Sequence, residues 1–418
     1  MAEPDLRCGR RRQGVCRNRA SVRRARPRMG GSMRSVTPGG STPGKGFDKL
    51  PGMTARSLSH SIGLLTLLLP ASVWLPAAQD ARQARPTPKV GEFHVLKADL
   101  HMHTVFSDGE VWPTTRVQEA WREDLDVISI SDHDDYHPFE KDVSADLARP
   151  FAIASPMAQG LGILLVPGVE ITKGDIHFNA LFVKEFNAFR GKELQAALAE
   201  AKRQGAFSFW NHPGWRGTAQ WWPPIATAYS DKLFQGIEIV NGDSYYAEAH
   251  PWIGQYNLTI ISNSDIHRPS LKAEERSLTL LFVRDKSLEG VREALDSGRT
   301  AAWQQKRLIG SEALLSSLFR AYVQTPAQIQ PAAGTRTAAL QLRNTSALHF
   351  DLKAVEAPKW MTVSPAQAGP LSTVLLTVRL AKDAPTTRQR VTVRLEVSNA
   401  LAGPAIPLVV PIEFEYIP

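Results

Sequence analysis

Strand-length apolar runs recur along residues 95–261 of this 418-residue chain, with segments of helical periodicity between and after them. The apolar runs are residues 95–100, 127–130, 163–166, 178–183, 206–210, 236–240 and 258–261. Apolar residues have helical spacing over residues 114–123, 193–204 and 288–295. Strands that alternate with helices predict a parallel sheet, and about seven such units predict an α/β barrel.

The pattern changes from about residue 325 to short alternating segments that are separated by Pro, Gly and Ser. Examples are residues 338–342, 374–380, 391–397 and 408–414. This pattern is typical of an antiparallel β-sandwich of roughly ninety residues. We therefore expect two folded domains, a barrel over residues 92–318 and an accessory β-sandwich over residues 325–418.

The positive charge of the chain is concentrated at its N-terminal end. Residues 1–52 contain 13 Lys or Arg and 3 acidic residues, which leaves 36 basic and 38 acidic residues in the rest. The segment has no apolar periodicity, which predicts a disordered basic tail, and a true translation start at Met53 would exclude it. A nucleic-acid-binding arm is the alternative. Because the remainder is not basic, we expect no nucleic-acid partner.

Residues 53–80 have the composition of a secretory signal peptide. Arg56 precedes a Leu-rich apolar run over residues 62–78 that ends in small residues. This predicts a periplasmic or secreted protein with no stable membrane insertion after cleavage. An uncleaved anchor is the alternative, although the apolar run is short for a bilayer span. The polar residues 81–89 predict a linker into the first domain.

Side chains that can bind metals follow almost every predicted strand of the first domain. They are His101, His103, His133, Glu170, His212, Asp265 and His267. Residues two apart in an extended chain point to the same face, and the active sites of α/β barrels lie at the carboxyl ends of the strands. These side chains should therefore form one site. Cys8 and Cys16 precede the signal, so imidazole and carboxylate must hold the metal, which favours zinc, manganese, iron or cobalt over magnesium.

These motifs resemble those of the PHP family, named for polymerase and histidinol phosphatase, over about residues 92–310. The matching segments are residues 99–104, 107–109, 131–133, 168–170, 211–213 and 264–267. The resemblance implies a distorted seven-stranded (β/α)7 TIM-like barrel, the PHP fold, with two or three metal ions that hydrolyse phosphoesters. Residues 112–113, 177–180 and 297–301 look closest to the family's exported phosphodiesterases, which act on organophosphate diesters.

The resemblance also implies three metal positions. The first would use His101, His103, Glu170 and Asp265, the second Glu170, His177 and His212, and the third Asp108, His133 and His267. Asp108 stands where some relatives have histidine, which favours manganese or iron over zinc at the third position. Glu170 would bridge two ions and so fix the spacing that in-line displacement at phosphorus requires.

A water that bridges two cations loses a proton near neutral pH, so we expect a metal-bridging hydroxide to be the nucleophile. The expected catalytic residues are Asp132, Glu170 and His212, and Asp134 and His137 are further candidates for the general acid. Orientation of a ligand histidine is the alternative role for Asp132.

Four residues are candidates for binding the substrate. Lys173 and Arg216 have the charge to bind a phosphate, and Trp215 and Tyr245 have the rings to contact an apolar ester group. The alternatives are solvated cations and aromatic packing at the mouth of the barrel. The expected substrate is a small phosphodiester. A phosphomonoesterase of the histidinol phosphatase type and a metal-binding protein without catalytic activity are the competing interpretations, and the sequence predicts no oligomeric state.

Overall fold

The computed structural model describes residues 81–418, so the predicted basic tail and signal peptide lie outside the described residues. Among the described residues, no helix is both long enough and apolar enough to cross a bilayer. Residues 81–89, the predicted linker, contain no helix or strand but are bound to the rest of the protein. The amide of Arg85 donates to Asp124 at 2.7 Å, and the carbonyl of Pro86 accepts from the amide of Ala347 at 2.8 Å. This segment therefore contacts both the first domain and the C-terminal domain.

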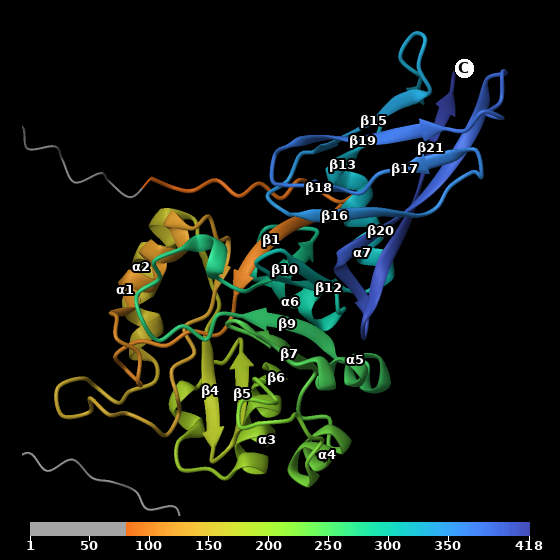
Figure 1. The fold of residues 1–418 in the computed structure, drawn as a ribbon. Helices are drawn as coiled ribbons and strands as arrows, with labels where there is room; N and C mark the ends of the chain where they lie inside the picture. Colours follow the sequence, from red (N-terminus) through yellow and green to blue (C-terminus); the bar gives the residue numbers. More distant parts are fainter. Residues whose placement is uncertain (1–80) are drawn as a thin grey trace, which may run out of the picture. The chain divides into compact units, whose positions relative to one another are not determined.

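Residues 92–318, the predicted first domain, contain two sheets with helices around them (Figure 1). One sheet has the strand order β12-β11-β10-β1-β2-β3, and the other has the order β4-β5-β6-β7-β8 with β9 beside β7. The strands of the first sheet are β1 (His94–Asp99), β2 (Val127–Ile128), β3 (Leu164–Leu165), β10 (Leu278–Val283), β11 (Thr300–Gln304) and β12 (Arg307–Gly310). Those of the second are β4 (Gly168–Lys173), β5 (Ile176–Leu181), β6 (Phe207–Trp210), β7 (Gly236–Asn241), β8 (Ser244–Tyr245) and β9 (Thr259–Asn263).

The two sheets meet where the predicted ligands lie. Two isolated parallel bridges connect the sheets. Met102–Ile266 joins the segment after β1 to the segment after β9, and His133–Glu170 joins the segment after β2 to β4. Parallel pairing holds for β1-β2-β3 and for β6-β7-β9. The domain is thus mixed α/β, with its sheets joined at the site.

The expectation of an all-parallel sheet is only partly confirmed. Strand β4 pairs antiparallel with β5, and β5 with β6. In the other sheet, β1 pairs antiparallel with β10, β10 with β11, and β11 with β12. The turn between β4 and β5 contains Gly174, whose φ of 63° suits a tight turn. A parallel pair needs a crossover of about a dozen residues or more, so this short connection can only make a hairpin.

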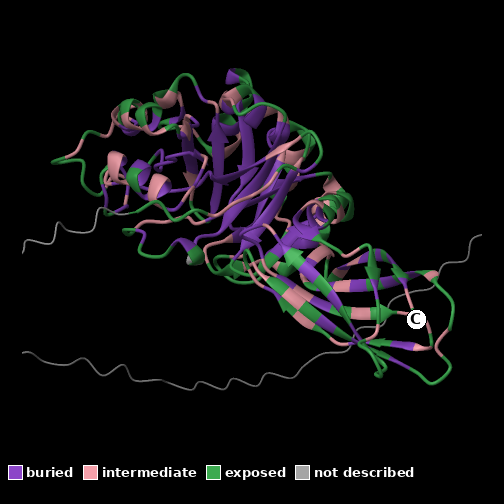
Figure 2. Cartoon of the chain, turned by 90° about the horizontal axis from the view of Figure 1, so that it is seen from above, coloured by how far each residue is buried: buried purple, intermediate pink, exposed green. Residues whose placement is uncertain are grey.

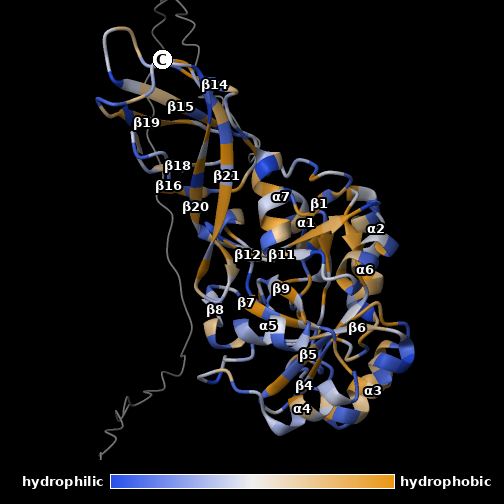
Figure 3. Cartoon of the chain, turned by 90° about the vertical axis from the view of Figure 1, so that its right-hand side faces the viewer, coloured by the Kyte–Doolittle hydropathy of each residue, from blue (hydrophilic) through white to orange (hydrophobic). Residues whose placement is uncertain are grey.

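Three of the helices correspond to the predicted helical segments. The helices of the first domain are α1 (Pro113–Arg122), α2 (Arg149–Leu161), α3 (Leu194–Gln204), α4 (Pro223–Ser230), α5 (His250–Tyr256) and α6 (Leu288–Asp296). Gly205 ends α3 in the left-handed conformation, and the side chain of Ser287 caps the start of α6. The strands are largely buried (Figure 2), whereas α3 has a hydrophilic outer face (Figure 3).

The C-terminal domain contains two packed sheets. One has the order β13-β15-β19-β17, and the other contains β14, β16, β18, β20 and β21. The strands are β13 (Val323–Gln324), β14 (Gln328–Ile329), β15 (Thr337–Asn344), β16 (Phe350–Glu356), β17 (Met361–Val363), β18 (Ala366–Ala368), β19 (Thr373–Leu380), β20 (Gln389–Gly403) and β21 (Ile406–Tyr416). The four predicted strand segments lie inside β15, β19, β20 and β21, as alternation of buried and exposed residues requires.

Strand β20 connects the two domains. Its C-terminal part pairs parallel with β12 through Leu308–Ala400 and Ile309–Leu401. Helix α7 (Glu312–Tyr322) lies between the domains in sequence, and its buried Phe319 packs edge-on against Phe350 of β16. The second domain therefore continues a sheet of the first and shares its hydrophobic core.

Candidate metal centre

The segment after β1 places two histidines inside the protein. The side chains of His101 and His103 are both fully buried. The amide of Asp265 donates to the carbonyl of His101 at 2.9 Å, and the amide of His103 donates to the carbonyl of Ile266 at 3.1 Å. These bonds hold the segment after β1 against the segment after β9, which carries Asp265 and His267.

Two clustered residues have a strained backbone. Asp265 has a φ of 50° and His212 a φ of 26°. Such conformations cost on the order of 1–3 kcal/mol in non-glycine residues and occur preferentially at functional sites. The amide of His212 donates to the buried carboxylate of Glu238 at 2.9 Å, which stabilises the conformation.

Glu170 lies at the centre of the cluster. Its Oε1 is 3.4 Å from Nε2 of His101, 3.1 Å from Nδ1 of His177 and 3.5 Å from Nε2 of His212. Its Oε2 is 3.3 Å from Nε2 of His103 and 2.9 Å from Nδ1 of His133. The two carboxylate oxygens therefore face different sets of histidines.

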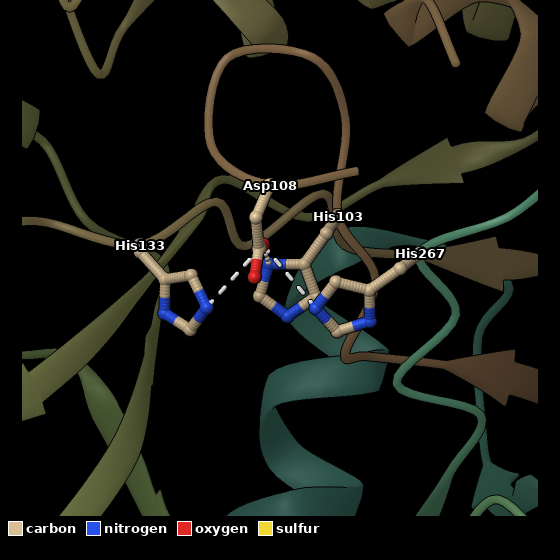
Figure 4. A group of neighbouring side chains, drawn as sticks. All are labelled: His103, Asp108, His133 and His267. Carbon is tan, nitrogen blue, oxygen red and sulfur yellow. Dashed lines mark ion pairs between the residues drawn. The ribbon is translucent and has the colours of Figure 1, made fainter. Parts of the chain in front are cut away.

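A second carboxylate, that of Asp108, contacts two histidines, one of which also contacts Glu170. Asp108 Oδ1 is 3.4 Å from Nε2 of His133 and 3.2 Å from Nε2 of His267 (Figure 4). The rings of His103 and His267 stack with their centroids 4.2 Å apart. These four side chains place a ligand atom each within 4.8 Å of one another.

All nine predicted ligands belong to this cluster. Ligand atoms gather in four overlapping groups, which are His103–Asp108–His133–His267, His101–Glu170–His212, His101–His103–Asp265 and His133–Glu170–His177. The first group contains the whole predicted third position and adds His103. The other three groups do not match the predicted first and second positions one to one, because Glu170 contacts histidines that were assigned to both positions. Which atoms bind each ion stays a prediction.

The chemistry of the cluster fits divalent metal ions. Among the described residues, several buried polar atoms of the cluster have no hydrogen-bond partner. They are His101 Nε2, His103 Nε2, Asp108 Oδ1, Glu170 Oε2, His212 Nδ1 and Asp265 Oδ1. Buried polar atoms are otherwise nearly always paired. A set of imidazole and carboxylate groups suits zinc, manganese, iron or cobalt.

The electrostatics of the cluster also favour a cation. Burial lowers the pKa of His101, but Asp265 and Glu170 outweigh burial and raise it well above its ordinary value of 6.5. Glu170 likewise outweighs burial at His133 and raises that pKa. Burial, with two neighbouring imidazoles, lowers the pKa of His103 to about 3. Protons therefore occupy part of the metal-free cluster, and a metal ion would displace them.

Glu238 is a functional residue that the sequence analysis missed. It is fully buried in β7, and its Oε1 lies 3.1 Å from Nδ1 of His101. The same carboxylate accepts from the side chains of Asn241 and Asn263 at 2.9 and 2.8 Å. A carboxylate on the far nitrogen of a ligand histidine fixes the tautomer and orientation of its ring. The sequence did contain one indication of this residue, because Glu238 is the single acidic side chain inside the apolar run 236–240.

Asp132 holds the loop that carries Asp108. It accepts from the amide of Thr104 at 2.7 Å, from the hydroxyl of Thr104 at 2.6 Å and from the hydroxyl of Ser107 at 2.6 Å. These contacts favour a positioning role over proton transfer. His137 Nδ1 is 2.8 Å from the carbonyl of Phe106, so it also contacts this loop.

The four predicted substrate-binding residues have different surroundings. Trp215 packs against the cluster, with its ring 5.2 Å from that of His177. Arg216 lies over Trp215 and pairs with Asp175 at 3.0 Å. Lys173 binds Asp134 at 2.7 Å, so its charge is already paired.

Tyr245 lies in a different cavity. Its hydroxyl is 2.6 Å from Nδ1 of His250, and the guanidinium of Arg307 is 5.0 Å from its ring. This cavity of about 420 Å³ is lined partly by residues of the C-terminal domain, such as Leu401. The structure therefore brings Trp215 to the cluster and places Tyr245 elsewhere.

One solved structure is similar to nearly the whole of the described chain. It is a two-domain protein from Bacteroides vulgatus, described as containing a predicted PHP-like metal-dependent phosphoesterase. The identity is 37%, the match covers 79% of this chain and 98% of that one, and the TM-score is 0.74.

More distant solved structures include two further hydrolases. Histidinol phosphate phosphatase from Lactococcus lactis, complexed with zinc, L-histidinol and phosphate, is 16% identical, with 51% of this chain and 98% of that one covered and a TM-score of 0.30. An amidohydrolase from Chromobacterium violaceum is 16% identical, with 41% and 88% covered and a TM-score of 0.33. No protein-family model and no curated protein matches the chain.

Proposed function

The chain belongs to the PHP-like metal-dependent phosphoesterases, and on that premise we propose that it is a metal-dependent phosphodiesterase that hydrolyses small phosphodiesters. The observation that carries the proposal is the position of Glu170, whose two oxygens face different sets of histidines. A carboxylate in this position suits a site with two or three divalent ions, which we propose to be zinc, manganese, iron or cobalt.

The bound ions would supply Lewis acidity to the phosphoryl oxygens and lower the pKa of a coordinated water. The residues of the chain orient this chemistry. Glu170 would fix the spacing of two ions, Glu238 holds the ring of His101, and Asp132 holds the loop that carries Asp108.

The surroundings of the cluster favour a diester over a monoester. A monoester dianion is best met by several free cationic side chains, but Lys173 and Arg216 are both paired with carboxylates. The exposed ring of Trp215 offers an apolar surface next to the cluster instead. A diester carries one negative charge and a second ester group that such a surface could contact. Phosphomonoester hydrolysis is the alternative.

Two further proposals concern the fold and the location of the protein. We propose that the two sheets of the first domain form the distorted seven-stranded barrel that the family resemblance implies. From the composition of residues 53–80, we also propose export to the periplasm or the medium. Fractionation of cells that produce the full chain would test the second proposal, because protein confined to the cytoplasm would refute it.

The proposed reaction can be tested on the full chain after chelation and reconstitution with zinc, manganese or cobalt. Bis(4-nitrophenyl) phosphate should be hydrolysed only by the metal-loaded protein, with a higher kcat/KM than 4-nitrophenyl phosphate. The opposite preference would support the monoesterase alternative. Failure of every metal form to hydrolyse either ester would contradict the hydrolase proposal.

A further inference from the structure

The exposed apolar side chains of the first domain are not scattered. Among the described residues 92–318, the large apolar side chains that are exposed each follow a clustered metal-binding residue by three to six positions. They are Trp112, Tyr136, Phe139, Trp215 and Leu271. Four of the five are aromatic. Single exposed apolar residues are ordinary, but a group restricted to the loops around one site indicates a binding surface.

Several contacts hold the side chain of Trp215 in place, although the residue is 42% exposed. The ring centroid is 5.2 Å from that of His177 and 5.6 Å from that of His212. Its Nε1 donates to the carbonyl of Asp175 at 3.3 Å, and the guanidinium of Arg216 lies 4.0 Å from the ring centroid. An exposed ring that is fixed in this way loses little entropy when a ligand packs against it.

Tyr136 adjoins another histidine of the cluster. The residue is 52% exposed, and its ring contacts the ring of His133 edge-on, with a centroid distance of 6.2 Å. His133 faces Oε2 of Glu170, whereas His177, which Trp215 contacts, faces Oε1. The two aromatic rings therefore adjoin histidines that approach Glu170 through different oxygens.

We propose that Trp215 and Tyr136 form the subsites for the two ester groups of the substrate, and that the substrates are phosphodiesters with at least one planar, apolar ester group such as an aryl ring. This inference rests on the proposed phosphodiesterase function. A phosphoryl group bound to metal ions that Glu170 and these histidines would hold would lie near both rings, so each ester group would have an aromatic partner. A monoester would leave one ring without a partner.

The test compares two substrates that have the same leaving group. Phenyl 4-nitrophenyl phosphate and methyl 4-nitrophenyl phosphate both release 4-nitrophenolate and differ only in the other ester group. The metal-reconstituted full chain should prefer the phenyl ester in kcat/KM. The ring that contacts the phenyl or methyl group determines the preference, so one of Trp215→Ala and Tyr136→Ala should reduce it roughly three-fold to ten-fold, mainly through a higher KM for the phenyl ester. The other ring contacts the 4-nitrophenyl group that both esters share, so its alanine variant should raise the KM of both esters.

Two further variants separate recognition from structure. Trp215→Phe keeps an aromatic ring and should retain most of the preference. Leu375→Ala removes an exposed apolar side chain of β19, outside the loops that carry the metal-binding residues, and should change the hydrolysis of neither substrate. An unchanged preference in both alanine variants would overturn the proposal. A parallel loss for both esters in both alanine variants would also overturn it, because the rings would then only support the metal ligands.

A binding measurement decides the inference independently of turnover. If the wild-type protein hydrolyses neither ester, the proposed reaction fails, and calorimetry with phenylphosphonate and methylphosphonate then tests the subsites alone. Tighter binding of phenylphosphonate that Trp215→Ala abolishes would support the aromatic subsites. Equal binding would refute them. Sedimentation with phospholipid vesicles that both alanine variants weaken, at an unchanged substrate preference, would instead identify a membrane contact and overturn the proposal.

Discussion

Replacing Arg116 by methionine should lower both the stability of the protein and its affinity for metal ions. Arg116 is fully buried in α1 and donates to three carbonyls, those of His103 at 2.9 Å, Ile266 at 3.0 Å and Arg268 at 2.8 Å. It also binds the carboxylate of Glu119 at 2.7 Å. One guanidinium therefore connects the segment after β1 to the segment after β9, and both segments carry metal-binding residues.

The size of the effect follows from these contacts. Leaving a buried carboxylate without its partner costs about 3–5 kcal/mol, and each unpaired carbonyl costs about 1–3 kcal/mol. These terms are not additive, and Arg276, 3.7 Å from Glu119, retains part of the pairing. We expect Arg116→Met to lower the free energy of unfolding by about 4 kcal/mol. Metal affinity should fall about ten-fold to a hundred-fold, as expected when groups that orient ligands are lost.

Lys97 provides a matched control. It is also a buried cation, in β1, and binds the carbonyl of Arg85 at 3.1 Å and the carboxylate of Asp124 at 2.8 Å. Lys97→Met should therefore reduce stability without changing metal affinity. Urea denaturation of the metal-free proteins and competition with a chromophoric chelator measure the two effects. A loss below about 1 kcal/mol for Arg116→Met, or equal metal affinities in the two variants, would refute the reasoning.

Three other predictions concern pH, the substitution of Glu238 and the substitution of Gly109. Because the pKa values of His101 and His133 are raised, their contribution to the stability of the metal-free protein is present below pH 6.5 and lost as pH rises through the raised values. The unfolding free energy of the metal-free protein should thus fall as pH rises above 6.5, whereas metal affinity should rise because ligands must be deprotonated; a flat metal-free profile would contradict this. Glu238→Gln, which weakens the contact with His101, should lower metal affinity about ten-fold or more in a chelator competition, and an unchanged affinity would count against an orienting role. Gly109→Ala would place a Cβ 2.6 Å from backbone atoms of the segment after β1 and should destabilise the protein by about 1–3 kcal/mol in thermal denaturation, whereas Gly254→Ala, in open space on α5, should be neutral or stabilising.

The sequence predicted the candidate site better than the sheets around it. The order of side chains along an extended strand is a local property, so His101 and His103 could be assigned to one face. Side chains that follow successive strands were also expected to meet at one edge, and the structure brings all nine predicted ligands together. Their division between individual ions depends on distances to Glu170 that no local pattern encodes.

The strand directions were less predictable. The stretch 163–183 contains three strands instead of the two expected, because residues 168–173 form a further strand and Gly174 allows it to make a hairpin with β5. Helix α2 was missed because Pro156 lies inside it, and an internal proline argues against a helix. The continuation of β20 into the sheet of the first domain is a long-range contact, and its pairing with β12 has no counterpart in the local sequence pattern.

The contacts of Glu238 and Lys173 could also not be predicted from the sequence. The contact between Glu238 and His101 joins residues 137 positions apart, so the sequence could mark an unusual buried acid but could not name its partner. Lys173 is the converse case, because its charge suggested a phosphate ligand whereas the structure pairs it with Asp134.

Anomalous diffraction from crystals of the metal-loaded protein would test the central claim most directly. We expect at least two peaks inside the cluster, with Glu170 contributing an oxygen at about 2.0–2.2 Å to each of two ions if these are zinc. A peak near Asp108, His133 and His267 would identify the third position. An absence of peaks from the cluster under saturating metal, or a Glu170 carboxylate that contacts a single ion, would contradict the account.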